Sequence, residues 1–111
     1  MNNTLYDRGR ATSLVPLLGS ITREIQERTV RLDRIERKIH NITSARGESA
    51  DVSNLVAEAA THRRELRLAK DELLELGCSI VGTRPLTIRI PGRRGEAKRS
   101  FVWRSGDPVL R

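Results

Sequence analysis

The sequence predicts an α+β protein, a long antiparallel two-helix coiled-coil hairpin with a small C-terminal antiparallel sheet at its open end. After Gly77 the apolar period becomes two, which is typical of strands. Before it, sixteen positions follow one another at steps of three and four, which is the spacing of a helical seam. The first stripe is Leu18, Ile21, Ile25, Arg28, Leu32, Ile35, Ile39 and Ile42, and the second is Val52, Leu55, Ala59, His62, Leu66, Ala69, Leu73 and Leu76.

Folding the chain back between the two stripes places each residue of one against a residue of the other in antiparallel layers. Large residues then face both alanines, as interdigitated packing prefers: Ile35 meets Ala59 and Ile25 meets Ala69. Only Arg28 and His62 interrupt the apolar pattern. The seam buries too little apolar surface to offset the entropy of ordering the hairpin. The apolar residues off the seam should therefore be covered by the C-terminal segment or by a second copy: Val15, Leu17, Val30, Val56, Leu68 and Leu74.

Local signals set the expected helix ends. Asp7 is a good N-cap for a short helical turn, and Pro16 and Gly19 interrupt the pattern before the long helix of 17–42. Pro16 can either open the long helix or kink it. The polar segment 43–51 should form the turn, with Gly47 in a left-handed conformation and Ser49 or Asp51 capping the second helix. Gly77 is the expected C-terminal stop of that helix.

The C-terminal segment has the alternation of a β-hairpin. Leu86, Ile88 and Ile90 alternate with polar residues, as do Phe101 and Trp103, and the glycine-containing loop 91–98 separates the two runs. Residues 79–81 are expected to add a third strand. The first helix starts where the second ends, so the sheet, together with Tyr6, should lie at the open end of the hairpin.

The 111 residues predict a single domain with an N-terminal segment (1–16), a helical hairpin (17–76) and a basic β segment (77–111). No apolar run approaches the roughly 20 residues that cross a bilayer, and the polar start lacks the features of a signal peptide. We therefore expect a cytoplasmic protein that does not bind membranes. Cys78 is the only cysteine, which excludes an internal disulfide and predicts a buried thiol.

Net charge is +7, and its placement is uneven. Residues 1–76 hold 13 Lys/Arg against 12 Asp/Glu, whereas residues 77–111 hold 8 against 2. This asymmetry favours an anionic partner for the C-terminal part, although a basic surface can equally serve solubility.

Residues along the chain resemble an uncharacterised prokaryotic family catalogued as domain of unknown function 2203. They are Tyr6, Ala11, Leu14, 16–18, the two stripes, Leu76-Gly77, 88–91, Trp103-Arg104 and Gly106-Asp107. The resemblance implies a helical hairpin, a stretch like G-L-V-D-F-P, a basic loop and C-W-x-x-G-E. Arg89 and Val102 replace the acidic residue and the cysteine of that pattern, and the W-H segment of the family has no counterpart here. The resemblance implies no activity.

No catalytic constellation is legible in the sequence. A nucleophile beside a base, paired carboxylates and a ligand cluster are all lacking, and the glycines at 92 and 95 match no phosphate-binding loop. His40 lies off the seam and His62 lies on it, too far apart to share a metal. We therefore expect a non-enzymatic protein with no catalytic residues, no metal and no cofactor.

Arg28 and His62 fall in neighbouring layers of the seam and allow two interpretations. With Glu24, Glu58 and Glu65 close in helical spacing, they can define a polar pocket. Alternatively, they set the register and number of partners at some cost in stability, and then Arg28→Leu should raise the melting temperature.

The basic C-terminal segment is the strongest functional hint. Its cations can neutralise phosphates while Phe101 or Trp103 stacks on a base, although the two rings share a face that should pack on the helices. Two functions follow: a scaffolding module that forms a homodimer through its helices, which we favour, or a nucleic-acid-binding accessory protein. An acidic protein is a third partner for the same cations. The candidate anion-binding residues are Arg84, Arg89, Arg93, Arg94, Lys98, Arg99 and Arg104.

Overall fold

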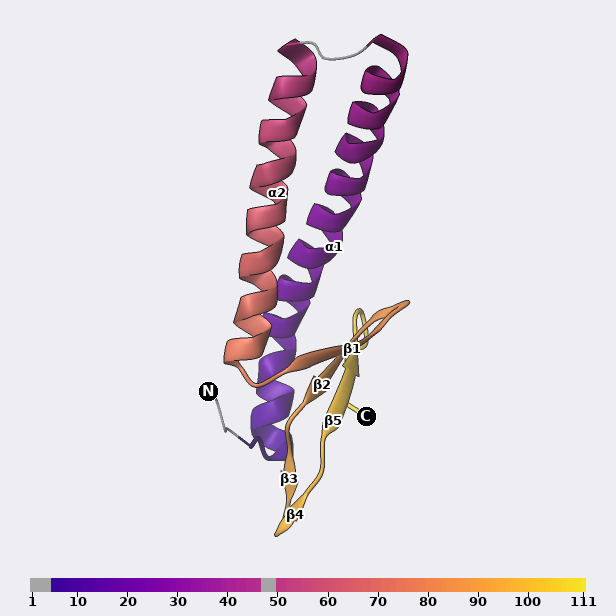
Figure 1. Cartoon of the computed structure of the whole chain (residues 1–111). Helices are drawn as coiled ribbons and strands as arrows, with labels where there is room; N and C mark the ends of the chain where they lie inside the picture. Colours follow the sequence, from indigo (N-terminus) through magenta and orange to yellow (C-terminus); the bar gives the residue numbers. More distant parts are fainter. Residues whose placement is uncertain (1–4, 47–49) are drawn as a thin grey trace. The chain divides into compact units, whose positions relative to one another are not determined.

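The computed structural model describes residues 5–46 and 50–111, and these form two helices followed by a small antiparallel sheet (Figure 1). The helices pack against each other, so the predicted α+β hairpin fold is confirmed. The elements are α1 (Arg8–Arg46), α2 (Ala50–Glu75), β1 (Ser79–Thr83), β2 (Leu86–Ile90), β3 (Arg93–Arg94), β4 (Ala97–Lys98) and β5 (Phe101–Arg104).

The chain divides into two compact units. The terminal unit comprises Met1–Arg23 and Lys70–Arg111, and the hairpin unit comprises Glu24–Ala69. Both helices contribute residues to both units, and the sheet belongs to the terminal unit alone.

The sixteen seam positions are all buried or half-buried, and none is exposed. In the hairpin unit the buried seam residues are Ile25, Ile35, Val52, Ala59, His62 and Ala69. In the terminal unit Leu18, Ile21 and Leu73 are buried. The heptad pattern therefore identifies the packed faces of both helices correctly.

Helix α1 begins earlier than expected and runs through Pro16 and Gly19 without a break. Asp7 is its N-cap, because its Oδ1 accepts a hydrogen bond from the backbone N–H of Arg10 at 2.8 Å. The alternative in which Pro16 opens the long helix is wrong, because α1 begins at Arg8. Proline removes one helical hydrogen bond, but the full burial of Ala11 and Leu18 stabilises the helix on both sides of Pro16.

Residues 43–46, expected in the turn between the helices, instead belong to α1. The positions predicted for Gly47 and Ser49 lie outside the described residues, and Asp51 lies in the first turn of α2. At the other end, Gly77 adopts a φ of 80°. The N–H of Gly77 bonds to the carbonyl of Leu74 and that of Cys78 to the carbonyl of Leu73, which is the Schellman pattern. Gly77 is thus the helix stop that the sequence predicts.

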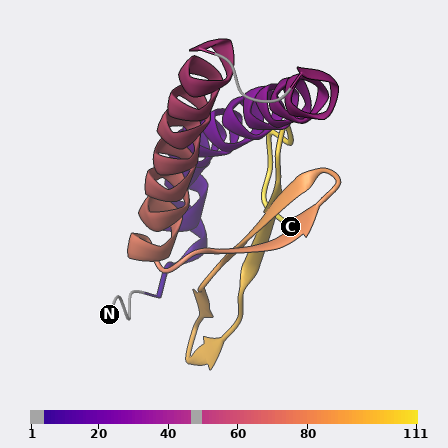
Figure 2. The same cartoon turned by 45° about the horizontal axis from the view of Figure 1, so that its top comes forward.

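The main sheet has three strands in the order β1-β2-β5, and all neighbours are antiparallel (Figures 1 and 2). The expected third strand, β1, is present and extends to Thr83. Beyond Ile90 the chain continues into the two-stranded β3-β4 hairpin, which forms the predicted basic tip. The backbone of Val102 in β5 also exchanges two hydrogen bonds with Arg111, so the final residue covers that edge of the sheet.

Tyr6 links three parts of the terminal unit. Its backbone N–H donates to the carbonyl of Pro91, and the N–H of Arg93 donates to the carbonyl of Tyr6. The buried phenol donates to the carbonyl of Leu76 at 2.9 Å, and burial raises the pKa of Tyr6. Through its backbone and its side chain together, Tyr6 therefore connects the N-terminal segment, the start of the basic loop and the end of α2.

Candidate functional sites

The predicted anion-binding residues all belong to the terminal unit, and all seven are exposed. Alternation along the strands explains the exposure of some of these cations. In β2, Leu86, Ile88 and Ile90 are buried, whereas Arg89 between Ile88 and Ile90 is exposed. Arg104 likewise follows the buried Trp103 on β5. Arg84 lies in the β1-β2 turn, and the remaining four cations lie in or beside the β3-β4 hairpin. None of the seven forms an ion pair with another described residue.

Phe101 and Trp103 are buried, with exposed fractions of 0% and 2%. The indole N–H of Trp103 is already used, because it donates to the carbonyl of Asp107 at 2.8 Å. The guanidinium of Arg94 lies 5.0 Å from the centroid of the Phe101 ring and forms a cation–π contact. The aromatic residues therefore form the core of the sheet, which removes the base-stacking role that the sequence allowed for them.

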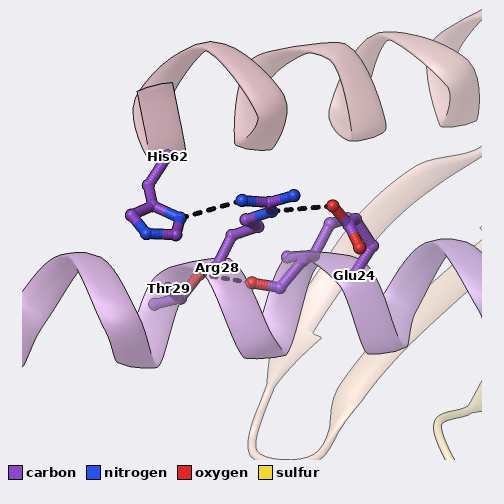
Figure 3. A network of polar contacts seen from close by, with 5 residues as sticks. Glu24, Arg28, Thr29 and His62 are labelled. Atoms are coloured by element: carbon purple, nitrogen blue, oxygen red, sulfur yellow. Dashed lines mark hydrogen bonds and ion pairs between the residues drawn. The ribbon is translucent and has the colours of Figure 1, made fainter. Parts of the chain in front are cut away.

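The two polar seam residues meet each other. Nη1 of Arg28 lies 3.0 Å from Nδ1 of His62 across the two helices, and Nε of Arg28 donates to Oε1 of Glu24 at 2.8 Å (Figure 3). This hydrogen bond to Glu24 raises the pKa of Arg28. A guanidinium can only donate, so Nδ1 of His62 accepts and the ring proton is on Nε2. The contact between Arg28 and His62 is compatible with both interpretations of the pair, a polar pocket and a pair that sets the helix register.

An apolar surface in the terminal unit was not found by sequence reasoning. It surrounds a hollow of about 230 Å³ lined by Leu73, Leu74, Cys78, Ile80, Lys70 and Ser79. Leu74 is 64% exposed, and Val81 on β1 is 56% exposed. We call the surface formed by 70–74 and 78–81 the α2–β1 face. The only sequence signal for it was that Leu74 lies off the seam.

Cys78, at one wall of this hollow, has only 1% of its surface exposed. Burial raises the pKa of its thiol to about 11. The predicted burial of this residue is confirmed, and the thiol is neutral at physiological pH.

Among the described residues, no group of three or more His, Cys, Asp or Glu side chains is arranged to hold a metal ion. None of the helices of residues 5–46 and 50–111 combines the length and apolar character of a membrane span.

These features define a class of small α+β proteins in which a helical hairpin is joined to a basic three-stranded sheet. The chain belongs to the family described as "Uncharacterized conserved protein (DUF2203)", whose model matches residues 4–111. The resemblance inferred from the sequence is thus confirmed over essentially the whole chain. No curated protein and no solved structure matches the chain.

Proposed function

We propose that this protein is a non-enzymatic scaffolding module that self-associates, with a second copy of the chain bound to the α2–β1 face. The observation that carries the proposal is the pairing of a protruding Leu74 with an adjacent apolar hollow on the same surface. A two-fold interface requires such a self-complementary patch, because the same residues meet from both copies. The two-fold axis would seat the Leu74 of each copy at the hollow of the other.

The off-seam apolar residues of the helices support self-association. Leu74, which lies in the same unit as the C-terminal segment, is 64% exposed, so that segment does not cover it. This exposure favours contact with a second copy, the other way to bury Leu74 that the sequence allows. Exposed apolar side chains beside a hollow are typical of association surfaces rather than of an inert surface.

The edge of the sheet next to this face is open. Within the described part of the chain β1 pairs with β2 alone, and its sequence Ser-Ile-Val-Gly-Thr contains no charged residue. Edge strands that avoid association usually carry charges or proline, or are covered, as Arg111 covers β5. A bulge at Val81 makes continuous strand pairing less favourable, so we assign the contact to side chains. The proposal includes a cytoplasmic location, which suits a chain that has no internal disulfide.

Light scattering after size exclusion tests this function. The wild type should have twice the 12.5 kDa mass of one chain, and Leu74→Glu should return it to the monomer. Leu68→Glu is the matched control, since Leu68 is also exposed on α2 but lies outside the α2–β1 face. A monomeric wild type at about 100 μM, a concentration that populates even weak dimers, would contradict the proposal.

Nucleic-acid binding is the second candidate, and the observation that favours it is a set of seven exposed cations that form no ion pair with the described acidic residues. With both aromatic rings buried, binding would rest on phosphate contacts alone, which predicts little preference for sequence. An acidic protein would meet the same cations. Labelled RNA and DNA should be titrated at several salt concentrations, because phosphate contacts make log affinity fall linearly with log salt.

Replacing Arg93, Arg94 and Arg99 by alanine should remove about three phosphate contacts. The slope of log affinity against log salt should become correspondingly less steep. The control variant replaces Arg23, Arg64 and Arg67, which are exposed helical arginines, and loses the same charge. Equal effects of the two triple variants would indicate attraction to net charge only. Binding weaker than about 10⁻⁴ M would contradict this second candidate.

A further inference from the structure

The hairpin unit contains a hollow of about 290 Å³ between its two helices, close to the volume of small-molecule sites. One wall is cationic, with Arg31, Arg34 and Lys38 on a single face of α1 at steps of three and four. Ile35 and Leu55 form an apolar part of the lining, and Glu58 and His62 complete it. Charged groups and apolar surface are therefore presented to the same small space.

The three cations of this hollow have no partners within the described chain. Other cations of the helices do have them: Arg28 pairs with Glu24, and Arg63 pairs with Glu36 at 3.1 Å. Glu27 has the favourable spacing to pair with Arg31, yet no such pair forms. Three unpaired positive groups around one hollow repel each other, and a bound anion would relieve that repulsion.

His62, which also lines this hollow, carries a ring N–H group. The ring is buried, and its Nδ1 accepts from Arg28, so the proton is on Nε2 (Figure 3). Nε2 lies 3.9 Å from Oε1 of Glu58, which is too long for a hydrogen bond. The contact with Arg28 thus fixes the orientation of the ring and leaves an N–H group that no acceptor among residues 5–46 and 50–111 uses.

We propose that this hollow binds a small organic phosphate monoester. Three positive charges less that of Glu58 leave a balance of about two, which matches a phosphate dianion. The guanidinium groups of Arg31 and Arg34 present paired donors to phosphate oxygens, and Lys38 adds a point charge. Ile35 and Leu55 contact the organic part of the ligand. The hollow belongs to the hairpin unit, so this inference does not depend on self-association through the α2–β1 face.

Calorimetric titration with phenyl phosphate and with inorganic phosphate tests the site. Both should bind saturably, and phenyl phosphate should bind more tightly because only it reaches the apolar lining. Arg34→Gln should weaken phenyl phosphate binding about tenfold, the loss expected for one charge-assisted contact. Arg37→Gln should change it less than about twofold, since Arg37 is exposed on the same helix outside the hollow.

The proposal also predicts a spectroscopic change. The ¹⁵N resonance of His62 Nε2 should shift on addition of phenyl phosphate to the wild type, and the shift should follow the same saturation curve. Equal losses for Arg34→Gln and Arg37→Gln would overturn the proposal in favour of diffuse charge attraction. No saturation by about 10 mM of either probe, or equally tight binding of the diester dimethyl phosphate, would also overturn it. If circular dichroism shows that the Arg34→Gln variant does not fold, Lys38→Gln is titrated in its place.

Discussion

Arg28 Nη1 and His62 Nδ1 lie 3.0 Å apart, and this contact joins the two positions at which the heptad seam is polar. Each residue satisfies the other: His62 is buried and needs a partner for Nδ1, and Arg28 has a second partner in Glu24. We therefore expect the pair to act as one polar element that specifies how the helices align, which is an attested use of buried polar residues in helical seams.

This pairing predicts how Arg28 variants behave. The seam pattern alone predicts a stability gain for Arg28→Leu, whereas the observed contact predicts a fall in melting temperature of about 3 to 8 °C, because His62 loses its partner. Arg28→Leu combined with His62→Leu should recover the loss, since both polar groups are then replaced. Thermal unfolding followed by circular dichroism measures both. A single variant as stable as the double variant would show that the contact contributes nothing.

Gly19 occupies an ordinary helical position with open space around it. A Cβ built at Gly19 meets no atom within 4 Å. Gly19→Ala should therefore raise the free energy of unfolding by about 0.5 to 1 kcal/mol, because alanine loses less backbone entropy on folding. Urea unfolding should show a higher midpoint with an unchanged slope. A lowered midpoint would mean that α1 is not continuous at this position.

Gly92 should respond in the opposite way. A Cβ there would overlap the carbonyl oxygen of Arg99, which lies between β4 and β5, and the ring of the buried Phe101 in β5. Gly92→Ala should lower the free energy of unfolding by roughly 1 to 3 kcal/mol, the usual range for overpacking. The same urea experiment measures it, with Gly19→Ala as the matched substitution in open space. An unchanged free energy of unfolding would exclude the close approach of Gly92 to Arg99 and Phe101.

The buried thiol of Cys78 predicts slow alkylation. Its pKa rises from 9.0 to about 11, so its thiolate fraction near pH 8 is lower than that of a free thiol by about 100-fold. Iodoacetamide should modify the native protein at least that much more slowly than the protein unfolded in urea. Equal rates would contradict the burial of the side chain.

The same pKa shift makes stability depend on pH. Between about pH 9 and 11 the unfolded chain loses the Cys78 proton while the folded chain keeps it. The folded state then binds more protons than the unfolded state, so the free energy of unfolding falls as pH rises through this window. Cys78→Ala should be less sensitive to pH there, as measured by urea unfolding at pH 8 and pH 11. An identical pH dependence for both proteins would contradict this assignment.

Much of the fold follows from periodicity. Steps of three and four identify the buried faces of both helices, and alternation identifies β2 and β5 together with their buried aromatic residues. Asp7 and Gly77 act through their nearest neighbours, so their roles as N-cap and helix stop could also be predicted. Pro16 misled the prediction because its local preference was outweighed by packing of the residues on either side.

For the candidate sites, too, some features could be predicted from the sequence and others are decided only by the tertiary structure. The amino-acid order alone establishes which residues face inward and that the basic side chains accumulate after residue 77, because these properties depend on neighbours a few positions away. Folding decides the contacts among Arg28, Glu24 and His62, the hollow beside Arg31, Arg34 and Lys38, and the apolar face at Leu74. Hydrogen bonds and hollows form between residues distant in the chain, and their partners are selected by distance and direction in space, which periodicity does not encode.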